Sequence, residues 1–223
     1  MVKTPRALLK RYVDSKGMVD YARWHSNLPD LQRLGRYVRA IANADPSIHS
    51  QTSQLAFYLN AYNALVLADV LASWPVDSVL KEEGFFDGRN HTVAGQQLTL
   101  NELEHDEVIR PRFSEPRIHF VLVCAALDCP RLRTTALTAA NLEAELAAAT
   151  AVFVPQATEL QEDGSVQTSQ LFNWFAEDFI AHSGSIAAYL RSHLRDDSLR
   201  QALESDQVTI TFSDYDWSIN APR

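Results

Sequence analysis

The sequence predicts an α+β fold in a single domain, in which a buried central helix packs on a small mixed β-sheet with peripheral helices around it. Residues 55–71 are apolar on nearly every face, which is the pattern of a helix inside a domain. Residues 118–123 form a short apolar run next to turn residues, which is typical of a strand covered on both faces. Short alternating segments elsewhere supply the remaining strands.

The chain has the length and composition of such a domain. It has 223 residues, of which 46% are hydrophobic and 22% are charged, and these values exclude disordered and fibrous proteins. We expect one domain over residues 1–223. Within it, residues 1–50 are expected to form an N-terminal helical clasp and residues 51–223 an α+β core.

Charge and hydropathy argue against two classes of partner. The 20 basic and 28 acidic residues give a net charge of −8, and no basic cluster is interleaved with aromatic residues, so we expect no nucleic-acid binding. We expect no membrane span, because the most apolar stretch contains Asn60, Asn63 and Asp69. The N-terminus lacks the apolar core of a secretory signal, but removal of a signal would leave the same pattern. Localisation and oligomeric state therefore stay open.

The first third of the chain is expected to be helical. Residues 7–13 and 31–41 carry apolar side chains at helical spacing. The buried helix at 55–71 is expected to end before Pro75, since proline cannot continue a helix.

A hairpin and a capped helix are expected next. Residues 91–98 alternate and turn near Gly95, as a short hairpin does. The segment Thr99–Glu102 fits a capping box, in which the threonine hydroxyl and the glutamate carboxylate satisfy exposed backbone N–H groups reciprocally. The helix that it starts is expected to reach about Arg110.

The second half is expected to alternate strands and helices. The expected elements are a central strand at 118–123, a helix at 138–150, a strand at 152–154, a hairpin turning at Asp163-Gly164, a helix capped by Ser169, and a last strand at 208–212.

Two asparagines lie one turn apart on the apolar helix. Asn60 and Asn63 project from one stripe, where each amide needs hydrogen-bond partners because water is scarce. One interpretation is that they organise a polar, substrate-binding pocket. The other is that they tie the helix to the backbone of neighbouring loops.

A second polar group follows the capping box. Asn101, Glu104 and His105 share a helix face at i, i+3 and i+4 spacing. The ring and the carboxylate are expected to serve catalysis and the amide to bind substrate. The alternative is a solvated charged face.

The third group contains His119, Cys124 and Cys129. On an unbroken strand His119 and Cys124 would point to opposite faces, so a direct pair requires the strand to end at Cys124. His105 is then the better candidate for the base that activates the thiol. Competing interpretations are a buried structural thiol, a Cys124–Cys129 redox pair, and a zinc site that uses both cysteines with a histidine.

Five segments together resemble the signature blocks of a known family. They are Phe57–Leu65, Leu98–His105, Pro116–Pro130, Leu171–Phe175 with Asp178-Phe179, and Tyr215–Asn220. They resemble the domain of unknown function 547 (DUF547) family over nearly the whole chain. One departure is Tyr58, where we expect tryptophan.

The resemblance implies a family without an established substrate. Its members are mostly bacterial and often exported, which implies a possible periplasmic location, and plant relatives carry extra segments. It also implies that the asparagine, glutamate, histidine and cysteine residues named above are the family's polar signature. A papain-like or transglutaminase-like architecture is an expectation by analogy alone.

These observations lead to an expected activity. We expect a cysteine-dependent hydrolase or acyltransferase that acts on an amide or thioester bond of a small peptide-like substrate. Cys124 would attack the carbonyl, His105 or His119 would transfer the proton, and Glu104 would orient the imidazole. Asn60, Asn63, Asn101 and Cys129 would bind substrate, with no metal and no cofactor. The alternative is a non-catalytic domain that binds a small ligand or a peptide and has structural cysteines.

Overall fold

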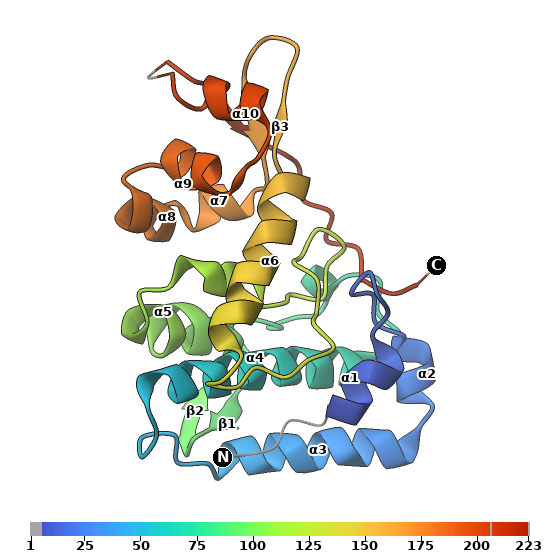
Figure 1. Ribbon diagram of the computed structural model, residues 1–223. Coiled ribbons are helices and arrows are strands. Elements are labelled where there is room, and N and C mark those ends of the chain that lie inside the picture. Colours follow the sequence, from blue (N-terminus) through green and yellow to red (C-terminus); the bar gives the residue numbers. More distant parts are fainter. Residues whose placement is uncertain (1–5, 206, 223) are drawn as a thin grey trace. The chain divides into compact units, whose positions relative to one another are not determined.

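The computed structural model describes residues 6–205 and 207–222, and it is a mixture of helices and small sheets that is about 51% helical (Figure 1). The expected α+β class is confirmed at this level. The described chain forms two compact units. The first unit comprises residues 6–113, 121–145 and 216–222, and the second comprises residues 114–120 and 146–215.

The first unit consists mainly of helices and one hairpin. Its elements are α1 (Arg6–Tyr12), α2 (Tyr21–His25), α3 (Leu28–Ala42), α4 (Gln51–Ser73), the 3₁₀ turn η1 (Val79–Lys81), β1 (His91–Val93), β2 (Gln96–Leu98), the π-helical turn η2 (Glu102–Asp106) and α5 (Ile109–Arg112). The helices expected at 7–13 and 31–41 are confirmed as α1 and α3.

The second unit combines short helices with a three-stranded sheet. Its elements are the 3₁₀ turn η3 (Pro116–Phe120), α6 (Leu142–Gln156), which begins within the first unit, β3 (Glu159–Leu160), β4 (Val166–Thr168), α7 (Leu171–Trp174), α8 (Ala176–Ser183), α9 (Ile186–His193), α10 (Asp197–Ala202) and β5 (Ile210–Phe212). The sheet order is β3-β4-β5, antiparallel and then parallel. This mixed sheet does not contain residues 118–123, around which the sequence predicted the sheet.

The buried helix α4 forms the centre of the first unit. The Ser50 hydroxyl accepts the backbone N–H of Ser53 and caps its start. At the other end Trp74 is extended before Pro75, as expected for a residue that precedes proline. Among the described residues α4 is the one helix long and apolar enough to cross a membrane, and 72% of its most apolar window is buried in the protein. A helix that is this apolar and this deeply buried is typical of the core of a domain.

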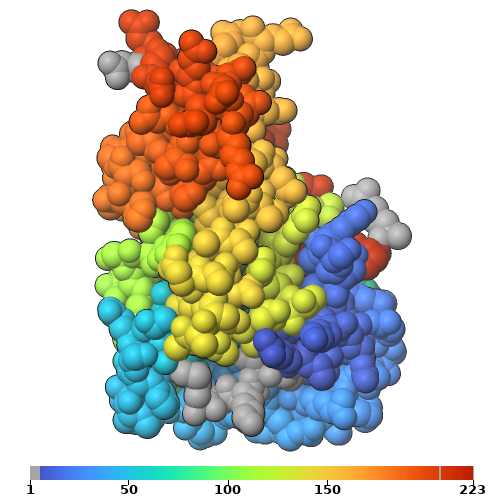
Figure 2. Space-filling view, viewed as in Figure 1, coloured from blue at the N-terminus to red at the C-terminus, as the bar shows by residue number. Residues whose placement is uncertain are grey.

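The N-terminal helices pack against this core. Both α2 and α3 contact α4, and α1 and α3 form part of the outer surface of the first unit, coloured blue in Figure 2. A buried carboxylate ties them together, since Asp30 on α3 accepts hydrogen bonds from Tyr12 at 2.8 Å and from Arg11 at 2.7 Å. Arg33 binds its second oxygen at 2.8 Å.

The expected hairpins and capping box are confirmed. β1 pairs antiparallel with β2 around Gly95, and β3 pairs with β4 around Gly164. The backbone N–H of Thr99 donates to the Glu102 carboxylate at 2.7 Å, and the N–H of Glu102 donates to the Thr99 hydroxyl at 3.1 Å. Both signals are local, because each depends only on residues close in sequence.

The strand expected at 118–123 is wrong. Pro116–Phe120 is a 3₁₀ turn in the second unit, and the chain continues in the first unit as a loop. The backbone groups that a strand would offer to a neighbour are used otherwise, because the carbonyl of Val121 and the N–H of Val123 bind the side chain of Asn63. The run is therefore buried as expected, but its hydrogen bonds go to a side chain.

Three other element predictions need correction. The strand expected at 152–154 is the last part of α6, whose Leu142–Gln156 span is longer than the helix expected at 138–150. The helix expected up to Arg110 is interrupted after η2, where the N–H of Glu107 bonds to the carbonyl of Glu102. The helix expected after Ser169 is divided at Phe175 into α7 and α8.

Aromatic packing forms the core of the second unit. The rings of Phe120, Phe172 and Phe179 lie within 6 Å of one another, at centroid distances of 5.8, 5.9 and 4.7 Å, and Tyr189 lies 4.7 Å from Phe179. Each of these rings is almost fully buried, so the cluster supplies a large share of the unit's apolar burial.

The last strand, expected at 208–212, is confirmed as the shorter strand β5.

Candidate functional site

The two cysteines lie in a loop of the first unit, residues 121–130, which we call the thiol loop. Asn63 on α4 holds the start of this loop with two hydrogen bonds: its amide NH₂ donates to the Val121 carbonyl at 2.8 Å, and its amide oxygen accepts the Val123 N–H at 3.0 Å. Both valines are buried. The amide thus replaces a neighbouring strand as the partner of this backbone.

The loop turns back so that the cysteines are neighbours. They are not joined in a disulfide, and both are partly exposed. The backbone N–H of Cys124 donates to the Cys129 sulfur, whose thiol lies 3.9 Å from the Leu122 carbonyl. Ala125 has a φ of 61°, a left-handed conformation that is uncommon for a residue with a Cβ. Cys129 therefore helps to close the loop around Cys124.

A buried carboxylate and a buried phenol accompany the sulfurs. Glu104 and Tyr62 are 6% and 4% exposed. Burial, followed by the charge and hydrogen bond of Glu104 and then by both cysteines, raises the pKa of Tyr62 well above its ordinary value. Tyr62 therefore stays a neutral hydrogen-bond donor to Glu104, close enough to the sulfurs to interact with their charge.

A second buried phenol lies beside the same sulfurs. Burial, and to a smaller extent the two cysteines, raises the pKa of Tyr21. Its hydroxyl donates to the Asn220 amide oxygen at 3.0 Å, and its ring stacks on Trp74. The thiols thus lie in an acidic, low-dielectric environment in which a thiolate needs a nearby cation or hydrogen-bond donors.

His105 is the imidazole that shares the first unit with the thiols. Its Nε2 lies 3.8 Å from the Glu104 carboxylate, and its side chain is 26% exposed. Both residues lie in the π-helical turn η2, where they are adjacent in sequence. Asn101 starts this turn and makes no capping hydrogen bond with its side chain, while its backbone N–H donates to Phe86 at 2.9 Å.

His119 lies in the second unit and has a partner there. Its buried ring stacks on Phe175 at 3.8 Å, and its Nε2 lies 2.7 Å from the Asp178 carboxylate. This is the geometry of an imidazole oriented by a carboxylate. The structure thus places His105 in the same unit as Cys124, and His119 in a separate pair.

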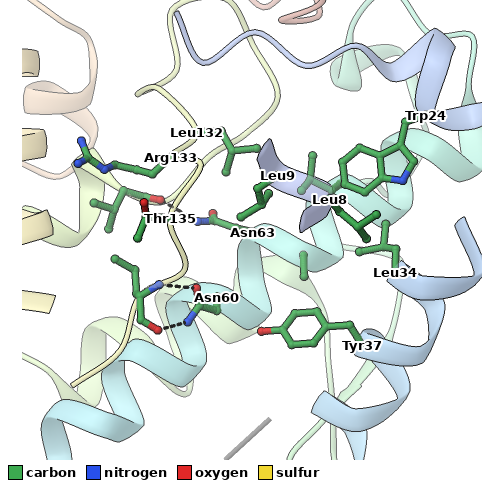
Figure 3. A pocket seen from close by; sticks show the side chains of 14 residues that line it. Leu8, Leu9, Trp24, Leu34, Tyr37, Asn60, Asn63, Leu132, Arg133 and Thr135 are labelled. Carbon is green, nitrogen blue, oxygen red and sulfur yellow. Dashed lines mark hydrogen bonds between the residues drawn. The ribbon is translucent and has the colours of Figure 1, made fainter. Parts of the chain in front are cut away.

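Asn60 ties α4 to a second loop. Its amide NH₂ donates to the Leu137 carbonyl at 2.8 Å, and its oxygen accepts the Leu137 N–H at 3.0 Å (Figure 3). Both asparagines therefore tie α4 to the backbone of neighbouring loops. This is the second of the two interpretations given for them in the sequence analysis.

A small cavity lies next to these asparagines. Its volume is about 40 Å³, and apolar side chains such as Leu8, Leu9 and Leu34 line it together with Asn60 and Asn63 (Figure 3). This space has room for about three or four water molecules at roughly 10–15 Å³ each. It is too small for a peptide-like molecule. The thiol loop is therefore the better candidate for a substrate site.

The described residues contain no group of three or more His, Cys, Asp or Glu side chains arranged to hold a metal ion. The zinc interpretation therefore has no ligand set within residues 6–205 and 207–222.

Sequence reasoning missed three side chains that the structure places around the predicted ones. Tyr62 is a buried residue of α4, and it also binds Glu104. Asp178 and Asn220 lie 59 residues from His119 and 199 residues from Tyr21. Spacing carries no signal for such distant pairs.

Comparison with known proteins supports the expected family. Residues 46–154 match the family described as "Protein of unknown function, DUF547". This range contains all eight predicted site residues, from Asn60 to Cys129, whereas the two last resembling blocks lie outside it. No curated protein and no solved structure shows significant similarity to the chain. Residues 46–154 are therefore similar to the DUF547 family, whose function is unknown.

Proposed function

We propose that this protein is a cysteine-dependent hydrolase or acyltransferase that acts on an amide or thioester bond of a small peptide-like molecule. The observation that carries the proposal is the thiol loop itself. It presents two partly exposed thiols, not joined in a disulfide, beside the buried Glu104–Tyr62 pair. A buried phenol with a raised pKa, as Tyr62 has, next to a nucleophile is typical of active sites.

The nucleophile is assigned to Cys124. The Cys129 sulfur accepts the Cys124 N–H and lies near the Leu122 carbonyl, so it acts within the loop. Cys124 stands directly before Ala125, whose left-handed backbone turns the chain. Backbone strain of this kind is often found at functional sites.

The proposed reaction follows ordinary acyl transfer. The Cys124 sulfur bonds to the carbonyl carbon while its proton passes to an imidazole, and the carbonyl electrons move to oxygen. As the oxyanion collapses, the bond to the leaving amine or thiol breaks and the imidazole returns the proton to that group. Water or an acceptor amine then attacks the thioester and releases Cys124.

The base is assigned to His105. It shares the first unit with Cys124, and the Glu104 carboxylate lies 3.8 Å from its ring. Glu104 is in turn bound by Tyr62, which limits the positions that the carboxylate can take. A carboxylate that orients the imidazole is the usual third member of such a set.

The proposal retains a papain-like or transglutaminase-like arrangement. A long buried helix that fixes the thiol-bearing segment supports it, since Asn63 on α4 binds the start of the thiol loop. The analogy concerns architecture alone.

The test combines thiol reactivity with turnover. Iodoacetamide alkylation of Cys124 is followed at neutral pH in the Cys129→Ser variant, and hydrolysis is measured with aminocoumarin amides and acyl thioesters of small peptides. We expect Cys124 to react faster than the same thiol in the urea-unfolded chain. Turnover should be lost in Cys124→Ser and retained in part in Cys129→Ser. His105→Gln should reduce turnover about a hundredfold or more.

Two results would overturn the proposal. One is a Cys124 that alkylates no faster than in the unfolded chain, and the other is turnover that survives Cys124→Ser. If His119→Gln, and not His105→Gln, abolishes turnover, the assignment of the base is wrong. The non-catalytic alternative predicts that a peptide probe binds Cys124→Ala as tightly as the unchanged protein, with no turnover by either.

A further inference from the structure

The C-terminal segment at residues 216–220 holds the thiol loop along its length. The N–H of Leu127 donates to the Ser218 carbonyl at 2.9 Å, and Ala126 pairs with Ile219 in an antiparallel bridge. The N–H of Asp216 donates to the Asp128 carboxylate at 2.7 Å. This segment, which we call the C-terminal strap, lies outside the region that matches the family.

Asn220 is the point where the strap meets the strained residue of the loop. Its backbone N–H donates to the carbonyl of Ala125 at 3.0 Å, directly after Cys124. A left-handed conformation costs a residue with a Cβ roughly 1–2 kcal/mol. It persists only where surrounding bonds enforce it. The bond from Asn220 is one of those that enforce it here.

Asn220 is itself fixed by two bonds from the opposite side. Its carbonyl accepts the N–H of Val19 at 2.9 Å, and its amide oxygen accepts the Tyr21 hydroxyl at 3.0 Å. Asn220 is 5% exposed and Tyr21 is 1% exposed, so water does not replace these bonds easily. Together the two bonds fix where the backbone N–H of Asn220 points, and the side-chain bond is the one that a substitution can remove.

We infer that Asn220 and Tyr21 are positioning residues for the proposed thiol chemistry. They fix the strap so that Ala125 stays left-handed and Cys124 keeps its place in the thiol loop. The inference rests on the proposed function for its meaning, although the control of Cys124 can be measured without a substrate.

The test measures Cys124 alkylation by iodoacetamide as a function of pH, in the Cys129→Ser background. Tyr21→Phe and Asn220→Ala remove the same hydrogen bond from opposite sides. Each should lower the alkylation rate about fivefold, which corresponds to one net hydrogen bond, and shift the midpoint of the pH profile. The double variant should show no more than the single change, because one bond is lost in all three.

Matched controls separate positioning from general destabilisation. Tyr12→Phe removes another buried phenol hydrogen bond of the first unit, the one to Asp30, and should leave the pH profile unchanged. Asn220→Asp retains an oxygen acceptor and should restore the native rate. If Asn220→Ala fails to fold, Tyr21→Phe decides the question against Tyr12→Phe.

The inference is overturned if Tyr21→Phe and Asn220→Ala alkylate like Tyr12→Phe, or if only one of them changes the rate. Its failure is distinct from failure of the proposed function. Turnover that survives Cys124→Ser refutes the cysteine-dependent mechanism, whereas an unchanged alkylation profile refutes the positioning role.

Discussion

Replacing Asn63 by alanine should weaken the protein and loosen the thiol loop together. The change removes two hydrogen bonds, one to the Val121 carbonyl and one from the Val123 N–H. Each is worth about 1 kcal/mol net, and an unsatisfied buried backbone group costs about 1–3 kcal/mol. Both valines are 2% exposed, whereas Asn63 is partly exposed, so water reaches part of the site. We therefore expect a loss of about 2–4 kcal/mol in the free energy of unfolding.

Asn60→Ala is the matched comparison. It removes the equivalent pair of bonds to Leu137, on a loop that carries no cysteine. Urea unfolding should give similar losses for the two variants, each lowering the melting temperature by roughly 2–4 °C per kcal/mol. Only Asn63→Ala should also lower the rate at which iodoacetamide alkylates Cys124, because only this change loosens the thiol loop.

Two results would refute this reasoning. A loss below about 0.5 kcal/mol for Asn63→Ala would mean that water replaces the amide at no cost. Equal alkylation rates of Cys124 in Asn63→Ala and Asn60→Ala would mean that α4 does not control the thiol loop.

Three further predictions concern pH and oxidation. Burial alone would raise the pKa of Asp30, but its hydrogen bonds and ion pairs lower it, so their stabilisation exists above the ordinary value of 3.8 and is lost on acidification below it. Urea midpoints should therefore fall less steeply below about pH 4 in Asp30→Asn. Burial and neighbouring positive charges lower the pKa of His193, so stability should decline as pH falls below 6.5, and His193→Gln should remove that decline in the same titration. Hydrogen peroxide should convert Cys124 and Cys129 to a disulfide, seen by mass spectrometry as the loss of two hydrogens, because one thiol is oxidised to a sulfenic acid and the other displaces water. Either single Cys→Ser variant should stop at the sulfenic acid. If the unsubstituted protein gains oxygen without losing two hydrogens, the two cysteines do not pair.

The parts of the fold that the sequence predicted correctly are those whose causes are local. The helix α4 follows from an apolar run without proline or glycine, and the capping box at Thr99 follows from two residues three positions apart. The hairpin at Gly95 requires a left-handed residue at its turn, which glycine supplies at no steric cost. In each case the residues that make the bond are close in sequence.

The central strand failed for the opposite reason. Periodicity reports that residues 118–123 are buried, but burial alone does not say which partner satisfies their backbone. At Val121 and Val123 the partner is the side chain of Asn63, sixty positions from Val123. The strand at 152–154 failed because α6 carries its β-branched and aromatic residues inside a longer helix, where tertiary context overrides propensity.

The same distinction applies to the candidate site. The sequence predicts which residue types take part, but it does not predict which residues bind one another. Chemistry selected Cys124, Glu104 and His105 from the sequence, because the chain has only two cysteines and seven histidines and these groups stand in one region. What fixes them comes from distant segments: Asn63 holds one end of the thiol loop, and Asn220 holds the turn that follows Cys124. An asparagine carries no signal in the sequence until its hydrogen-bond partner is known. The sequence therefore identifies the reactive groups more readily than the groups that position them. Variants of Asn63 and Asn220 therefore test the structure, while variants of Cys124 and His105 test the chemistry.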